Sequence, residues 1–234
     1  MTLAVQLLGH SDYAEVHALQ RQLVDARAAG DIPNVLLLLE HASTITVGKK
    51  KAAEANVLDA GDIPVVPVER GGDVTWHGPG QLVAYPIIAL EGDRKDLHRH
   101  LHSLEEAVIG LLQDYGLAPT RDDRNTGVWL PRAEGDPQKV CSIGIACRRW
   151  VTWHGLALNV VPDPDAFARI HPCGFDASVM TRLADHLNPP PSVQAMAAPL
   201  ARHLARALDV PLDGSIRYCD RPDEVRQLLK LGGD

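Results

Sequence analysis

The chain has 234 residues and a formal net charge of −7, with 23 Lys and Arg residues against 30 Asp and Glu residues. This balance leaves no basic excess to neutralise phosphates, so it argues against nucleic acid or an anionic membrane as the main partner. We see neither an apolar run of the roughly 20 residues that a membrane span needs nor a secretory signal at the N-terminus. The 4 cysteines have no C-x-x-C spacing, and we therefore expect a cytoplasmic protein with free thiols.

Periodicity predicts the elements of the first half of the chain. Apolar residues at helical spacing behind a capping Asp12 indicate a helix at 12–29, and a continuous apolar run indicates a buried strand at 34–40. The further elements expected here are a strand at 43–47, a polar helix at 50–60, an edge strand at 64–69, a strand at 81–88 and a long amphipathic helix at 93–115. The glycine-rich segment 70–81 joins two strands and can bring backbone N–H groups close to a ligand.

The second half contains a predicted β-hairpin and several short elements. The elements expected are a strand at 127–130, hairpin strands at 139–147 and 151–160, a short helical piece at 165–170, a helix at 178–187 and an amphipathic helix at 192–208. Strands and helices mix without a regular βαβ repeat, which favours an α+β domain with a mixed β-sheet. Three prolines before residue 192 are the nearest thing to a boundary, so we expect a main domain at 1–191 and a helical extension at 192–234 that packs on it.

Cys173 is the first candidate for chemistry. It lies between Pro172, which fixes one backbone angle, and Gly174, which can adopt a positive φ. This arrangement presents a thiol at a turn, and a turn thiol beside a base is a candidate nucleophile. The alternative is an inert packing residue, as most cysteines are.

Lys139 is the candidate base. If 139–147 is an unbroken strand, alternation puts Lys139 on one face with four apolar residues, Cys141, Ile143, Ile145 and Cys147. Burial there would lower the pKa of the lysine and make it a usable base. The alternative is a lysine that extends to solvent from a strand end. By the same counting, His154 stands at the end of a face that continues through apolar residues.

Other candidates have weaker support. His98, His100 and His102 suggest a metal site, but alternate residues of a helix diverge by about 200°, so we expect no metal. The glycine-rich segments match neither nucleotide-binding fingerprint. Cys141 and Cys147 are expected in the core, and no base is close to Cys219 in the sequence.

The glycine-rich segment resembles the signature of the lipoyl(octanoyl) transferases. The resemblance is carried by Arg70-Gly71-Gly72, Thr75-Trp76-His77 and Gly78-Pro79-Gly80-Gln81, with Tyr85 following. Further matches, in the order of the family, are Glu40-His41, Thr46, Gly48, Gly127-Val128-Trp129, Lys139-Val140, Ser142-Ile143-Gly144, His154-Gly155-Leu156-Ala157-Leu158-Asn159 and Pro172-Cys173-Gly174. One departure is Lys49-Lys50 after Gly48, where an arginine is commoner.

The resemblance implies a fold, a reaction and roles for residues. The fold would be that of the catalytic domains of biotin and lipoate ligases, a mixed β-sheet flanked by helices. Cys173 would take an octanoyl group from acyl carrier protein as a thioester, and Lys139 would favour the thiolate and move protons. The acyl pocket would be lined by Arg70, Gly71, Gly72, Asp73, Val74, Thr75, Trp76, His77, Ser142, Ile143, Gly144, Gly155, Leu156 and Ala157. His154 and Gln81 would support it from behind.

The implied reaction is the first step of protein lipoylation from endogenous fatty acid. The acceptors would be lysines of lipoyl domains in 2-oxoacid dehydrogenase complexes and of the glycine cleavage H protein, and no cofactor would take part. The chemistry of the residues agrees, because acyl exchange between thiols is nearly balanced in free energy and a thiolate is the reactive form. The basic clusters Lys49 to Lys51 and Arg148-Arg149 are candidate docking sites for the acidic carrier.

Two alternatives stay open at this point. An ATP-dependent lipoate or biotin ligase could share the fold, but such an enzyme has no use for a turn cysteine. A non-catalytic acyl-binding protein could keep the pocket without forming a covalent adduct.

Overall fold

A seven-stranded mixed sheet forms the middle layer of the computed structural model, which describes residues 2–214 and 216–231. The strand order is β10-β1-β2-β6-β9-β8-β7. β10, β1 and β2 run parallel, and the other neighbouring pairs are antiparallel. The bounds are Leu3–Ser11 for β1, Asn34–His41 for β2, Gln81–Ile87 for β6, Gly127–Leu130 for β7, Gln138–Arg148 for β8, Val151–Asn159 for β9 and Arg217–Cys219 for β10. The predicted mixed sheet is confirmed.

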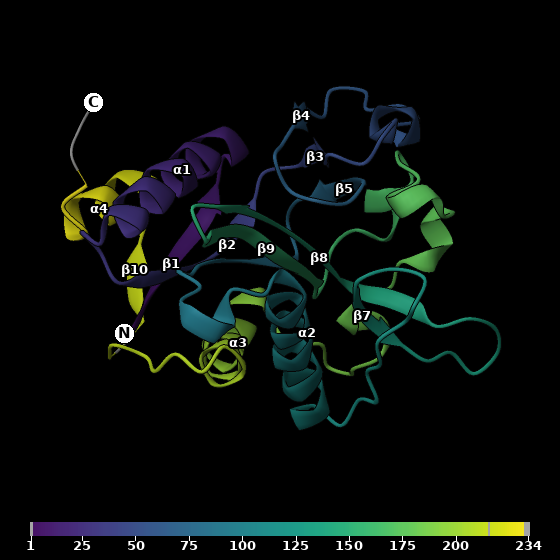
Figure 1. Cartoon of the computed structure of the whole chain (residues 1–234). Helices are drawn as coiled ribbons and strands as arrows, with labels where there is room; N and C mark the ends of the chain where they lie inside the picture. The colour runs from purple at the N-terminus through teal and green to yellow at the C-terminus, as the bar shows by residue number, and fades with distance from the viewer. Residues whose placement is uncertain (1, 215, 232–234) are drawn as a thin grey trace.

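Helices cover both faces of this sheet (Figure 1). One face carries α1, Tyr13–Ala29, and α4, Pro222–Leu228, and the other carries α2, Leu97–Asp114, and α3, Val193–Ala207. Asp12 caps α1 as expected, because its side chain accepts a hydrogen bond from the Glu15 backbone N–H. Among the described residues, each helix is too short or too polar to cross a membrane.

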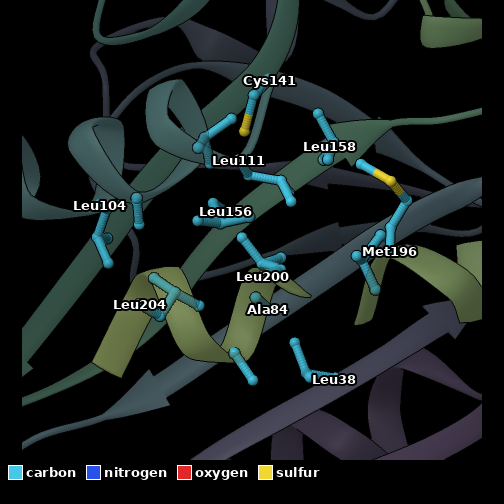
Figure 2. Close-up of a cluster of buried hydrophobic side chains, with 14 of the residues drawn as sticks. Leu38, Ala84, Leu104, Leu111, Cys141, Leu156, Leu158, Met196, Leu200 and Leu204 are labelled. Carbon is cyan, nitrogen blue, oxygen red and sulfur yellow. The ribbon is translucent and has the colours of Figure 1, made fainter. Parts of the chain in front are cut away.

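The strands supply side chains to both cores. Leu36 and Leu38 of β2 pack on the side of α2 and α3, whereas Leu37 and Leu39 pack on the side of α1. Figure 2 shows the first core, where strand residues such as Leu38 and Leu156 meet helix residues such as Leu111 and Leu200. A strand that is buried on both faces reads as a continuous apolar run, which is why β2 could be predicted from sequence.

A second, smaller sheet lies beside the main one, near β8 and β9 (Figure 1). Its order is β4-β3-β5, with bounds Val65–Pro67, Thr44–Val47 and Val74–His77 for β4, β3 and β5. Its core contains Ile45, Val47, Trp76 and Phe167. The segment 70–81, which we expected to join two strands as a loop, therefore contains a strand of its own.

The N-terminal strand and the end of the chain were not predicted as strands. β1 lies between β2 and β10, and its Leu3 and Val5 are buried on the side of α2 and α3. β10 pairs with β1 over only three residues, Arg217, Tyr218 and Cys219. The helix α3 contributes Met196 and its neighbours to the same core as α2, as Figure 2 shows.

Two predicted helices are wrong. The segment 50–60 forms only a 3-10 turn at Ala53–Asn56. The segment 178–187 contains two 3-10 turns, Ala177–Val179 and Leu183–Asp185. Between these turns the Thr181 N–H donates to the carbonyl of Lys139 at 3.0 Å, so partners on β8 take the backbone groups that a helix would use.

Candidate active site

A cavity of about 220 Å³ lies between the small sheet, β8, β9 and the cysteine turn. Much of its wall is apolar, from Val74, Leu101, Ile143, Leu156 and Val179. The predicted pocket residues that line it are Arg70, Gly71, Gly72, Asp73, Val74, Thr75, His77, Ser142, Ile143, Gly144, Gly155, Leu156 and Ala157, and they are joined by Cys173, Lys139 and His154. Four separate sequence segments, 70–77, 139–144, 154–157 and the cysteine turn, therefore meet at one site.

Trp76 is the predicted pocket residue that faces elsewhere. Successive residues of β5 point to opposite sides, and the Trp76 ring packs edge-to-face on Phe167 at 5.5 Å between centroids. Gln81 lies one layer behind the cavity, where its Oε1 accepts from His77 Nδ1 at 2.8 Å. Gln81 Nε2 donates to Asn159 Oδ1 at 3.0 Å, so Gln81 of β6 is anchored by β9 and holds the His77 ring directly.

The cysteine turn is a 3-10 turn at Pro172–Gly174 with unusual backbone angles. Cys173 has φ 59° and ψ 21°, and Gly174 has φ 84°. A left-handed conformation at a non-glycine residue costs on the order of 1–3 kcal/mol and is concentrated at functional sites. The sequence pointed to Gly174 for this conformation, whereas both residues adopt it, and the Cys173 thiol lines the cavity.

Asn125 connects the two residues that the sequence singled out. Cys173 Sγ donates to Asn125 Oδ1 at 3.4 Å, and Lys139 Nζ donates to the same oxygen. Trp129 Nε1 in turn donates to the Asn125 carbonyl at 3.2 Å and holds this loop in place. We did not predict Asn125; the available signal was its position two residues before the Gly127-Val128-Trp129 match.

A β-bulge, not simple alternation, positions Lys139. Cys141 pairs with Val128 but Lys139 pairs with Trp129, with a register shift between them. Val128 and Trp129 are successive residues and face opposite ways, so the expectation that Lys139 and Cys141 share a face is wrong. Lys139 Nζ instead lies 5.4 Å from the centroid of the Trp129 ring.

Gly127 gives Lys139 the space that it occupies. A Cβ on Gly127 would lie 2.5 Å from Lys139 Cε and 2.4 Å from the Cys141 carbonyl oxygen. Its φ of 144° also lies where side chains are strained. Gly127 therefore leaves the space that the Lys139 side chain needs.

Burial and neighbouring charges change the pKa of Lys139 and of three cysteines in different ways. Burial lowers the pKa of Lys139, and the nearby Cys173 opposes this shift. Cys141 is completely buried, and burial raises the pKa of its thiol to about 12, so it stays protonated. Burial also raises the pKa of Cys147 and of Cys219, which lie away from the cavity.

Arg70 holds the glycine-rich segment against the small sheet. Its Nη2 donates to both the carbonyl and the hydroxyl oxygen of Thr46 at 2.9 Å, and its Nη1 donates to the Gly71 carbonyl at 3.2 Å. Its Nε is buried without a hydrogen-bond partner among the described residues. Arg70 thus brings a buried cation to the cavity wall.

The Asp73 carboxylate is occupied by hydrogen bonds from neighbouring protein groups. It accepts hydrogen bonds from Lys50 Nζ, from Asn56 Nδ2 and from the Val74 N–H, each at 2.8 Å. Burial raises the pKa of Asp73, but these hydrogen bonds outweigh burial and hold the pKa below its ordinary value. Asp73 therefore lines the cavity as a fixed part of its wall.

One end of the cavity, which we call the closed end, is polar, and the buried Arg70 cation lies close enough to act on its side chains. It is formed by Tyr13, His77 and Tyr85, with His41 behind them. The Tyr85 hydroxyl donates to His41 Nε2 at 2.8 Å while His41 Nδ1 donates to the Ser11 carbonyl. Burial lowers the pKa of His41 to about 4 and that of His77 to about 3, and it raises the pKa of both tyrosines. Neither tyrosine was predicted as a site residue.

The histidines that suggested a metal in the sequence do not gather in space. His100 is buried, whereas His98 and His102 are exposed. Among the described residues, the one group with three possible ligand atoms close together is His17, Glu69 and His154.

Comparison with known proteins places this geometry in a family. A model of the lipoyl protein ligase A/B catalytic domain matches residues 12–205. The chain belongs to this family. Octanoyltransferases are among its relatives: that of Syntrophotalea carbinolica is 43% identical over 206 residues, covering 88% of this chain and 94% of the relative. That of Geobacter metallireducens is 45% identical over 188 residues, covering 80% and 85%. These relatives confirm the prediction of an acyltransferase.

The family fold is also seen in a solved structure. A lipoate-protein ligase A bound with ATP matches with a TM-score of 0.71 and covers 98% of this chain and 95% of its own. The two chains are 17% identical, so this likeness concerns the fold. The predicted ligase-like architecture is confirmed.

Proposed function

We propose that this protein transfers an octanoyl group from octanoyl-acyl carrier protein to a lysine of a lipoyl domain through a thioester on Cys173. One observation carries the proposal: Cys173 and Lys139 share the amide oxygen of Asn125 at the more exposed end of the cavity, which we call the open end. A thiol and a buried amine at such short range are suited to nucleophilic catalysis with proton transfer. The octanoyltransferase relatives support the same reaction.

In the first step the Cys173 sulfur attacks the carbonyl carbon of the carrier thioester. Lys139 takes the thiol proton and returns it to the departing carrier thiolate as the carbon–sulfur bond to the carrier breaks. In the second step a neutral lysine amine attacks the Cys173 thioester and an amide forms. The proton that the amine loses passes through Lys139 to the Cys173 sulfur. Burial lowers the pKa of Lys139, which favours this exchange because the amine gives up its proton more easily.

An acyl chain would lie along the apolar wall toward the closed end. Val74, Ile143 and Leu156 offer the surface that such a chain buries. The histidines and tyrosines at the closed end are neutral, and the nearby Arg70 guanidinium is hydrogen-bonded to Thr46 and Gly71. Acceptors would be lipoyl domains of 2-oxoacid dehydrogenase complexes and the glycine cleavage H protein, and the carrier-bound donor points to the cytoplasm as the site of reaction.

The competing function is that of an ATP-dependent ligase, which the fold alone permits. A ligase activates a free acid as an adenylate, and its acyl group never passes to a cysteine. The Cys173 thiol in the cavity and its contact with Asn125 favour the transferase.

Intact-protein mass spectrometry tests the proposal. After incubation with octanoyl-acyl carrier protein and no ATP, the protein should gain the mass of one octanoyl group and lose it when a lipoyl domain is added. Cys173→Ser should abolish thioester formation, whereas Cys141→Ser, which changes a buried thiol, should retain it. Octanoyl transfer that persists undiminished in Cys173→Ser would overturn the thioester mechanism.

A further inference from the structure

Three potential metal ligands meet beside the closed end of the cavity. They come from three different elements: His17 from α1, Glu69 from the loop between β4 and β5, and His154 from β9. One ligand atom from each residue lies within 4.8 Å of the other two. Glu69 Oε2 lies 2.9 Å from His17 Nε2 and 3.9 Å from His154 Nε2. The proposed acyl transfer uses neither His17 nor Glu69.

One of these atoms lacks the partner that its burial demands. His154 is 2% exposed, and its Nε2 has no hydrogen-bond partner among the described residues. A buried polar atom without a partner costs roughly 1–3 kcal/mol. Glu69 Oε2 lies 3.9 Å from this nitrogen, which is too far for a hydrogen bond. The carboxylate instead meets His17 Nε2 at 2.9 Å, so a hydrogen bond explains His17 but leaves His154 unexplained.

We propose that His17, Glu69 and His154 bind a zinc ion. Two imidazoles and one carboxylate are a common ligand set for zinc, with a fourth position left to water. Bonds of about 2.0–2.1 Å to a tetrahedral ion put ligand atoms roughly 3.4 Å apart. The separations of 2.9 and 3.9 Å from Glu69 lie on either side of this value, so small side-chain movements would complete the site.

The surroundings of the three ligands would let a zinc ion enter from solvent and would hold the two histidine rings in place. The side chains of His17 and Glu69 are 16% and 36% exposed, so an ion can reach them from solvent. Stacking on Trp153 holds both rings, at 5.5 Å for His17 and 4.4 Å for His154. The adjacent Arg70 guanidinium is directed to Thr46 and Gly71, so the Glu69 carboxylate would exchange its contact with His17 for the ion.

A bound zinc would join α1 to the cavity wall. His154 lines the cavity, and Glu69 directly precedes Arg70, which holds the glycine-rich segment. No pattern in the sequence indicates this site, and we expected the protein to bind no metal. The inference stands on contacts outside the thioester chemistry, so it does not depend on the proposed function.

Zinc titration of the metal-free protein by calorimetry tests the site. The measurement is made in the Cys173→Ser background, because a reactive thiolate would also bind zinc. We expect one zinc per chain, and His17→Gln should weaken binding by at least about tenfold, since loss of supporting residues alone costs 10–100-fold. His203→Gln is the matched control: His203 contacts the Asp114 carboxylate at 2.7 Å, in a pair outside the three-ligand group.

A second variant guards against misfolding of the first. Glu69→Gln keeps a partly exposed side chain of the same shape, and zinc should raise the melting temperature of the parent but not of this variant. Absence of stoichiometric zinc binding would overturn the proposal. So would binding that His17→Gln and His203→Gln weaken equally.

Discussion

The open and closed ends of the cavity are both lined by titratable groups, but the surroundings favour different charge states at the two ends. At the open end, burial lowers the pKa of Lys139 but the neighbouring thiol favours the ammonium, and both groups share one amide oxygen. At the closed end, burial lowers the pKa of His41 and His77 to about 4 and 3, and their partners are a tyrosine hydroxyl and an amide.

The difference shows that burial alone does not make a group reactive. Cys141 demonstrates this most clearly, because it is close to Lys139 and still has a pKa of about 12. At the open end, Cys173 and Lys139 lie close enough to exchange a proton. At the closed end, His41 and His77 are neutral, and so are the groups to which they hydrogen-bond. The open end is thus suited to chemistry and the closed end to holding an uncharged chain.

The largest effect is expected from removing the amide that joins the open end together. Asn125→Ala should lower kcat for octanoyl transfer by roughly ten- to a hundredfold, since a hydrogen bond to a charged group contributes about 1.5–3 kcal/mol. The backbone contact of this loop to Trp129 would remain, so the fold should persist. The readout is the pH profile of kcat, which should shift with the loss of a contact to Lys139.

Asp123→Ala, at an exposed position in the same loop, is the control for Asn125 and should transfer octanoyl groups at the parental rate. A parental kcat and pH profile in Asn125→Ala would mean that the shared oxygen only fills space.

Much of the scaffold around the site could be predicted, because its elements have local signals. β2 is a continuous apolar run that is buried on both faces, and Cys173 lies between residues that shape a turn. The position of Lys139 could be predicted only in part: its burial followed from apolar neighbours, but its direction depends on a bulge that exists only through pairing with β7. Asn125 is a single polar residue in a loop, and nothing in its neighbourhood indicates which side chains it will meet.

The predicted helix at 50–60 shows how tertiary contacts override a local tendency. Asn56 donates its side-chain amide to Asp73, and its carbonyl accepts from the His171 N–H at 2.7 Å. These contacts fasten the segment to the cysteine turn, which neither composition nor periodicity can indicate. The same reason applies to His17 and Glu69, which are distant in sequence from His154 and meet it only in the fold.

The neutral closed end predicts a loss of stability in acid. The pKa of His41 is about 4 in the folded protein against 6.5 for the free side chain, so the unfolded state takes up a proton first. Stability is therefore complete above pH 6.5 and falls as the pH drops toward 4, by about 2 kcal/mol between pH 7 and 5 for this residue. Denaturant unfolding at the two pH values should show a smaller loss in His41→Gln than in the parent.

Equal losses of unfolding free energy in His41→Gln and the parent would mean that His41 is not held neutral by burial.

The smallest expected effect concerns the approach of the proposed acidic carrier to the open end. Lys49 and Lys51 are exposed beside Lys50, which Asp73 already engages, whereas Arg148 and Arg149 both contact the Asp25 carboxylate. Reversing Lys49 and Lys51 to Glu should raise KM for the carrier-bound donor by roughly fivefold at low salt, as exposed charges contribute up to about 1 kcal/mol each. The increase should shrink as salt screens the charges. Reversing Arg148 and Arg149 should change KM less, because Asp25 already offsets them, and a larger rise there would move the docking surface to the β8–β9 turn.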